Sequence, residues 1–294
     1  MEKRSIIDVS LNILYNIRIQ FPNGKVLHIM LIDFHTHAFA DSLAPRAIAS
    51  LSAASGGLTP STDGTVAGLL HRMDADGVSH SVMLNIATKP KQQTRINDWA
   101  KEISSGRITA FGSVHPDAPD ALEELERIKD LGLKGIKLHP EYQNFEVDDP
   151  RLFPIYKKAA SLGLITVFHA GQDIGFMPPA KAAPDRLLRA LSVFDGAPVV
   201  AAHFGGYIMW DEVLEKLCGL PVYFDTSFCF GRIQHPLAQA IVEKHTPDRI
   251  LFGTDLPWSD AKTEKRLIDS LDLTDADKEK IFFRNAASLL QINL

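Results

Sequence analysis

Eight short apolar segments that alternate with helical segments predict an α/β fold, closed into a (β/α)8 barrel with a short N-terminal extension. A chain of 294 residues suits one barrel of this kind, which often needs about 250 residues. A doubly wound open sheet is the alternative. That fold would carry a G-x-G-x-x-G turn after an early strand, and the sequence has none.

Residues 1–29 form the expected extension, ahead of a barrel that covers 30–294. Apolar runs at 17–20 and 26–30 flank an Asn-Gly pair, which is typical of a β-hairpin. Alternatively, Met30 is the natural start and the extension is an over-extended reading frame. Asp8 and Asn12 interrupt the first apolar stretch, so we expect no signal peptide.

The expected barrel strands are short and apolar. They cover 31–37, 78–84, 108–114, 134–138, 164–168, 198–202, 221–224 and 249–252. Helical patterns cover 66–73, 96–103, 121–131, 152–162, 184–194, 210–217 and 237–245, and two more helices close the chain. The long Ala- and Ser-rich connection over 38–62 is expected to hold a further helix and to act as a functional lid.

Composition argues for a protein that acts on a small molecule. The net charge of −5 gives no basic patch for a nucleic acid or an anionic membrane. Two cysteines, Cys218 and Cys229, cannot make a disulfide framework, which suits the cytoplasm. No unbroken apolar run reaches the length of a membrane span. A homo-oligomer is left open.

Polar residues end nearly every expected strand, at the edge where barrel enzymes carry their catalytic residues. Six of the 11 histidines fall there. The residues at these strand ends, in chain order, are His35, His37, His115, Lys137, His139, His169, His203, Asp225 and Asp255.

The pair His35 and His37 indicates a metal site. Alternate side chains of a strand leave on one face, so Asp33 is expected to project with both histidines. Imidazole and carboxylate ligands without cysteine suit a catalytic Zn²⁺ with an open coordination position. Water bound at that position has a pKa of about 7. Asp255 is the candidate that both holds the ion and accepts the proton of that water.

Four motifs together resemble the amidohydrolase superfamily, in its amidohydrolase-2 group of metal-dependent TIM-barrel hydrolases and decarboxylases. The motifs are His35-Thr36-His37, His169-Ala170-Gly171, Ala202-His203-Phe204-Gly205-Gly206 and Phe252-Gly253-Thr254-Asp255-Leu256-Pro257-Trp258. The resemblance covers roughly 31–290. It implies metal ligation by His35, His37, His169 and Asp255, while His203 would polarise the substrate or complete a second metal site.

The fourth strand leaves the ion count open, although one ion is favoured. Lys137 is expected to be a carbamate bridge between two ions, an anchor for a substrate carboxylate, or an ion-pair partner of Asp33 or Glu141. His139 is expected on the same face of this strand as Lys137. Three further residues are candidates for contact with the substrate or the barrel mouth: His115, Arg232 and Trp258.

These residues predict a metal-dependent hydrolase. Metal-bound hydroxide would attack the carbonyl of an amide, lactone or ester, with His203 and the ion stabilising the oxyanion. The alternative is a non-oxidative decarboxylase of an aromatic or unsaturated carboxylic acid at the same metal site. A third hypothesis is a non-catalytic metal-binding barrel.

Overall fold

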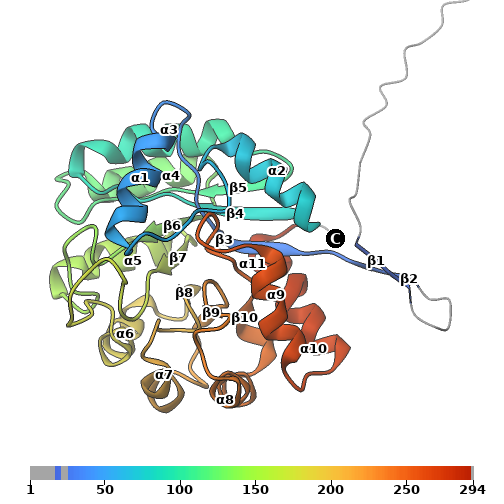
Figure 1. Cartoon of the computed structure of the whole chain (residues 1–294). Helices are drawn as coiled ribbons and strands as arrows, with labels where there is room; N and C mark the ends of the chain where they lie inside the picture. Colours follow the sequence, from blue (N-terminus) through green and yellow to red (C-terminus); the bar gives the residue numbers. More distant parts are fainter. Residues whose placement is uncertain (1–16, 21–25, 293–294) are drawn as a thin grey trace, which may run out of the picture.

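Eight parallel strands form the wall of a barrel, and helices surround it (Figure 1). The structure, a computed structural model, describes residues 17–20 and 26–292. The barrel strands are β3 Ile32–Thr36, β4 His80–Leu84, β5 Ile108–Phe111, β6 Gly135–Leu138, β7 Ile165–Phe168, β8 Val199–Ala201, β9 Tyr223–Asp225 and β10 Ile250–Leu251.

Backbone hydrogen bonds close the barrel at two seams. The strands run in the order β3-β4-β5 on one side and β6-β7-β8-β9-β10 on the other. At the first seam Gly112 N, just past β5, donates to Gly135 O at 2.9 Å. At the second, Phe34 N donates to Phe252 O at 2.8 Å, which joins the first barrel strand to the last. The predicted (β/α)8 barrel is confirmed.

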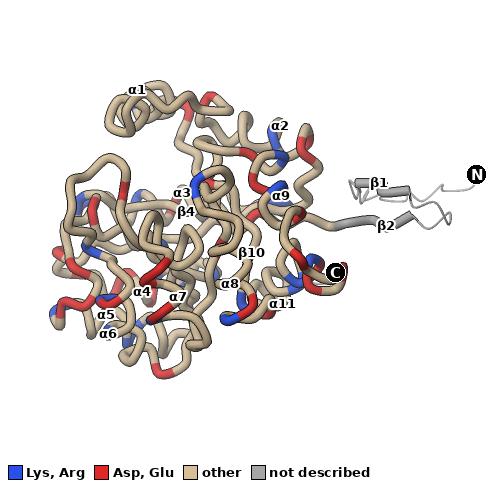
Figure 2. The backbone as a smooth tube through the Cα atoms, turned by 60° about the horizontal axis from the view of Figure 1, so that its bottom comes forward, with Lys and Arg blue, Asp and Glu red and all other residues tan. Residues whose placement is uncertain are grey.

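The helices stand where the sequence pattern predicts them. They are α2 Val66–Asp76, α3 Gln93–Ile103, α4 Ala121–Asp130, α5 Phe153–Ser161, α6 Pro184–Leu191, α7 Trp210–Lys216, α8 His235–His245, α9 Ala261–Ser270, α10 Asp275–Glu279 and α11 Asn285–Leu290. The expected helix in the long connection is α1 Ala44–Ala54, which stands apart from the other helices in Figure 2. Its role as a lid stays a prediction.

The barrel is filled by one of the two layers of apolar side chains. The inner layer includes Ile32, Phe34, Val82, Phe111, Val167, Val200 and Leu251, together with Ala286 and Leu290 of α11. The outer layer lies between the strands and the helices. Because strand side chains alternate in direction, the polar residues of the inner face meet inside the barrel.

The N-terminal extension contains the predicted hairpin strands. β1 Ile17–Gln20 pairs antiparallel with β2 Val26–Ile29, so that Ile17 lies opposite Ile29. The Asn-Gly turn and residues 1–16 lie outside the described residues, and a start at Met30 stays a prediction. In the part of the chain that the structure describes, the helices are too short or too polar to cross a membrane.

Candidate metal centre at the barrel mouth

Three side chains from the first and last barrel strands converge at the barrel mouth. His35 Nε2 lies 3.2 Å from His37 Nε2. Asp255 Oδ1 lies 3.4 Å from His35 Nε2 and 3.2 Å from His37 Nε2. Tetrahedral ligand atoms at about 2.0–2.1 Å from one ion lie about 3.3–3.4 Å from each other. The three atoms therefore have the spacing of three ligands to one zinc-sized ion, and we call His35, His37 and Asp255 the first group.

An irregularity in β3 places these histidines. The pairing of β3 with β4 shifts register between Asp33 and Thr36. Asp33 consequently borders a small space beside Leu69 of α2 and Ala261 of α9, on the helix side of the barrel. Its carboxylate accepts hydrogen bonds from Thr254 Oγ1 at 2.6 Å and Thr254 N at 3.0 Å. The prediction that Asp33 projects with His35 and His37 is wrong, because regular alternation stops at the shift.

Both predicted catalytic residues have left-handed backbone conformations. The φ angle is 65° at Asp255 and 58° at His203. Such angles are uncommon outside glycine and persist where surrounding bonds hold them. Here Asp255 N donates to His35 O at 2.7 Å, and His203 N donates to Asp225 Oδ1 at 3.0 Å. These hydrogen bonds therefore hold both residues in an uncommon backbone conformation.

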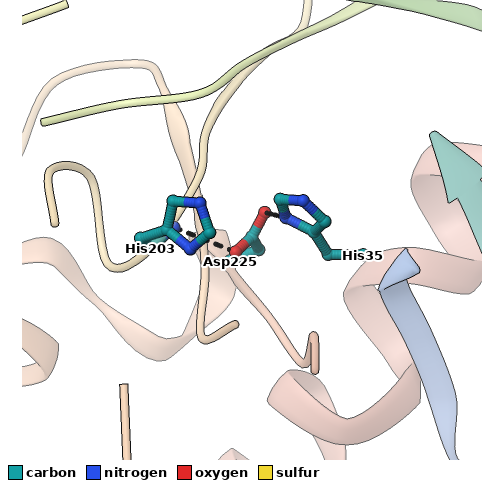
Figure 3. Close-up of side chains that lie close together, drawn as sticks. All are labelled: His35, His203 and Asp225. Atoms are coloured by element: carbon teal, nitrogen blue, oxygen red, sulfur yellow. Dashed lines mark hydrogen bonds and ion pairs between the residues drawn. The ribbon is translucent and has the colours of Figure 1, made fainter. Parts of the chain in front are cut away.

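Hydrogen bonds behind the first group orient its imidazoles. His35 Nδ1 donates to Asp225 Oδ2 at 2.8 Å, and His37 Nδ1 donates to Leu84 O at 2.9 Å. Figure 3 shows Asp225 between His35 and His203. With the proton on Nδ1, each Nε2 keeps the lone pair that a metal needs. Burial, aided by the Lys137 charge, lowers the pKa of His35 to about 4, so this ring is neutral at neutral pH.

Asp225 is thus a positioning residue for the first group. Burial alone would raise its pKa, but the electrostatic interaction and hydrogen bond with the Nδ1–H of His35, together with the hydrogen bond from Ser227, hold the pKa below its usual range. We expect Asp225→Asn to weaken binding of the catalytic ion about 10- to 100-fold, because the ring of His35 loses its charged acceptor. Titration of the metal-free protein with Zn²⁺ measures this. An unchanged affinity would contradict the assigned role.

The structure places His169 in a different group from the one implied by resemblance. Its Nδ1 lies 3.1 Å from His203 Nε2, while its Nε2 lies 3.8 Å from Asp173 Oδ2. His139 Nε2 lies 3.3 Å from the same carboxylate oxygen. Ligand-type atoms of His139, His169 and Asp173 lie within 4.8 Å of one another, and we call them the second group. Ligation of the first ion by His169 stays a prediction.

Lys137 is buried beneath the mouth without a partner. It pairs in register with Val167, which belongs to the inner layer of the barrel. Among the described residues, its Nζ has no hydrogen-bond partner and forms no ion pair. The alternative that pairs Lys137 with Asp33 or Glu141 is therefore wrong. Burial lowers the pKa of Lys137 to about 8, against the opposing charges of Asp225, Asp255 and Asp173.

The three other candidate residues have local contacts. His115 is buried, and its Nδ1 accepts from Asp117 N at 3.1 Å. The Arg232 guanidinium stacks over the Phe228 ring at 3.6 Å from its centroid. Trp258 N donates to Asp255 O at 2.8 Å, which ties the backbone of Trp258 to that of Asp255. Their roles toward a substrate stay predictions.

Two site residues escaped the sequence analysis. Asp173 lies five residues past Phe168, the last residue of β7. Ser227 donates through Oγ to Asp225 and lies 2.9 Å from His203 Nδ1. The signal for Asp173 is the Asp-x-Gly turn, in which Gly175 N donates to Asp173 Oδ1 at 2.7 Å. Residues that a loop brings back to the barrel mouth cannot be predicted from the strand ends alone.

An eight-stranded barrel with an H-x-H pair and a last-strand aspartate converging at its mouth is typical of a metal-dependent barrel enzyme. The chain belongs to the amidohydrolase family, whose model, described as Amidohydrolase, matches residues 32–292. The family resemblance seen in the four motifs is confirmed.

Several of the similar proteins are decarboxylases by name. A 2-amino-3-carboxymuconate-6-semialdehyde decarboxylase of Dictyostelium discoideum is 27% identical over 157 residues, which span 48% of this chain and only 40% of that protein. The 5-carboxyvanillate decarboxylase of Sphingomonas paucimobilis is 18% identical, with a TM-score of 0.67 over 90% of this chain and 100% of that one. A 5-carboxyvanillate decarboxylase of Novosphingobium aromaticivorans, complexed with manganese, is 16% identical, with a TM-score of 0.66 over 90% and 96%. The two structures show the shared fold.

The sequence-based expectation of a hydrolase is met at the level of the family alone. The comparisons agree better with the alternative, decarboxylation, because the relatives just described carry that activity in their names.

Proposed function

We propose that this protein is a metal-dependent, non-oxidative decarboxylase of an aromatic or unsaturated carboxylic acid. The observation that carries the proposal is the buried, unpaired ammonium of Lys137 in the same barrel as the first group. A buried cation without a partner is costly unless it meets an anion, and a substrate carboxylate is such an anion. The similarity to a muconate-semialdehyde decarboxylase supports the same substrate class.

The first group fits a divalent cation in spacing, tautomer and donor type. His35, His37 and Asp255 would hold the ion, which when bound supplies Lewis-acid polarisation of an oxygen on the substrate. We propose Zn²⁺, with Mn²⁺ as the alternative that one fold neighbour contains. Metal analysis of the purified protein identifies the ion.

The proposed reaction exchanges a carboxylate for a proton. Lys137 Nζ binds the carboxylate, and the bond between the carboxylate carbon and the neighbouring carbon breaks, releasing CO₂. The electron pair stays on the substrate carbon, which takes up one proton. Asp255 is the proposed proton carrier, which takes a proton from solvent and passes it to that carbon. Burial would raise the pKa of Asp255, but the hydrogen bond of His37 and the electrostatic interaction with His35 lower it, so the resting carboxylate is ionised and can accept that proton. His203 orients the oxygen substituent.

Hydrolysis is the second candidate, because a catalytic ion held by three protein ligands generally carries a water as its fourth ligand. The two reactions incorporate solvent differently. We expect substituted benzoates or unsaturated dicarboxylates to release CO₂ and, in D₂O, to gain one deuterium on carbon. A product acid that gains ¹⁸O from H₂¹⁸O, without CO₂ release, would instead establish hydrolysis. Loss of turnover after chelation, restored by Zn²⁺ or Mn²⁺, would exclude the non-catalytic barrel.

A further inference from the structure

Exposed apolar side chains gather on loops that follow the barrel strands. Seven large apolar residues of the described chain are exposed, and four of them lie in the loops after β7 and β8. These four are Ile174, Phe176, Met177 and Ile208, and we call them the apolar rim. We propose that the apolar rim binds an apolar group of the substrate. The inference rests on the proposed function, and it narrows the substrate to acids that carry an apolar group away from the carboxylate.

Hydrogen bonds hold the two loops of the apolar rim together. Gln172 N in the loop after β7 donates to Tyr207 O in the loop after β8 at 3.0 Å, beside Ile208. Within the loop after β7, Gln172 Nε2 donates to Phe176 O at 2.7 Å. These bonds fix both loops before any ligand arrives, so binding requires little further ordering of the chain.

Aromatic rings connect the apolar rim with the barrel mouth. The ring of Phe176 lies edge-on to that of Tyr142, with 5.0 Å between the centroids, and Tyr142 lies edge-on to His139 at 4.6 Å. In the loop after β8, Tyr207 comes directly before the rim residue, and its ring centroid lies 6.0 Å from that of His203. Each loop of the rim is therefore one aromatic ring away from a histidine of the mouth.

Ile208 gives the strongest evidence that the rim has a function. Its φ angle is 63°, a left-handed conformation that is an outlier for a β-branched residue. Its side chain is 61% exposed, so packing against the described residues does not offset this strain. Asparagine or glycine would adopt the same backbone at a lower cost in free energy. Contact with a ligand accounts for an isoleucine at this position.

The position of Lys137 sets the direction of the substrate. Under the proposed function its buried ammonium binds the carboxylate, so the rest of the acid points outward to the mouth and the apolar rim. A charged group at that outer end would lose hydration against four apolar side chains. An apolar group there instead removes apolar surface from water, on the substrate and on the rim.

The test compares three acids on the full chain loaded with Zn²⁺. The probes are benzoate, meta-butylbenzoate and para-butylbenzoate, and titration calorimetry measures their affinities. The variants Ile208→Asn and Met177→Ser each remove one apolar side chain of the rim. Leu122→Ser is the matched control, because Leu122 is 39% exposed but belongs to α4, on the outside of the barrel.

We expect one butyl isomer to bind about 10- to 50-fold more tightly than benzoate, because each buried methylene strengthens binding about fourfold. This preference should fall at least about threefold in Ile208→Asn and Met177→Ser and persist in Leu122→Ser, while benzoate itself binds equally to all four proteins. Ile208→Asn should also melt about 2–4 °C higher, since asparagine tolerates the left-handed backbone. A residue that only maintained the fold would lower the melting temperature when replaced.

Equal affinity for the three acids, absence of binding, or a preference that survives both rim variants would overturn the inference. A dimer on size-exclusion chromatography that both variants dissociate, with the preference unchanged, would overturn it and assign the rim to a second copy of the chain. CO₂ release is measured separately. Release without a butyl preference overturns this inference alone, whereas the preference without release from any acid overturns the proposed function alone.

Discussion

The substitution Asp255→Asn is expected to lower kcat by about 10²- to 10⁴-fold, because an amide cannot carry the proton that the reaction moves. The same substitution weakens binding of the ion, since it removes the only charged ligand among the three ligands of the first group. Asparagine tolerates the left-handed backbone of this position, where φ is 65°, so the fold should be kept. Steady-state kinetics at saturating metal separate the lost proton transfer from the lost ion.

The control for this variant is Asp248→Asn, on an exposed carboxylate that precedes β10, whereas Asp255 follows the other end of that strand. It should leave kcat unchanged. If Asp255→Asn retained more than a tenth of the turnover with the metal bound, Asp255 would not be the proton carrier. His203 would then be the next residue to test, because it occupies the strained position on the neighbouring side of the mouth.

The substitution Lys137→Met is expected to have opposite effects on activity and stability. Loss of the ammonium removes the proposed anchor of the substrate carboxylate and should lower kcat/KM about 10- to 100-fold, as expected for a hydrogen bond between charged groups. The folded protein should melt at the same or a higher temperature, since Lys137 Nζ is buried without a partner and methionine has a similar shape. Kinetics and a thermal melt, measured on the same preparation, check both effects.

Metal content separates the two remaining roles of Lys137. If Lys137 anchors the substrate carboxylate, Lys137→Met leaves the number of bound ions unchanged. If Lys137 is a carbamate bridge between two ions, the same substitution lowers the number of bound ions. The matched control is Lys101→Met on the exposed face of α3, which should alter neither activity nor metal content. Full activity in Lys137→Met would show that Lys137 does not anchor the substrate, and would contradict the argument for the proposed function.

Much of this architecture could be predicted from local patterns. The apolar segments and helical periodicities recur along the chain, and parallel strands in a barrel end at one edge, so the histidines that follow them had to gather there. His35, His37 and Asp255 are close together for that reason. Their chemistry also follows from residue type, because imidazole and carboxylate without cysteine are typical ligands of a catalytic cation.

The sequence by itself therefore determined the barrel, the edge that carries the polar residues and the three residues of the first group. Only the tertiary structure decided which atoms face each other. The register shift in β3 turns Asp33 toward the helices. The turn at Gly175 brings Asp173 back to His139 and His169, and Lys137 stays unpaired inside the wall. These outcomes depend on strand register and loop path, which join residues far apart in sequence and leave no periodic trace in it.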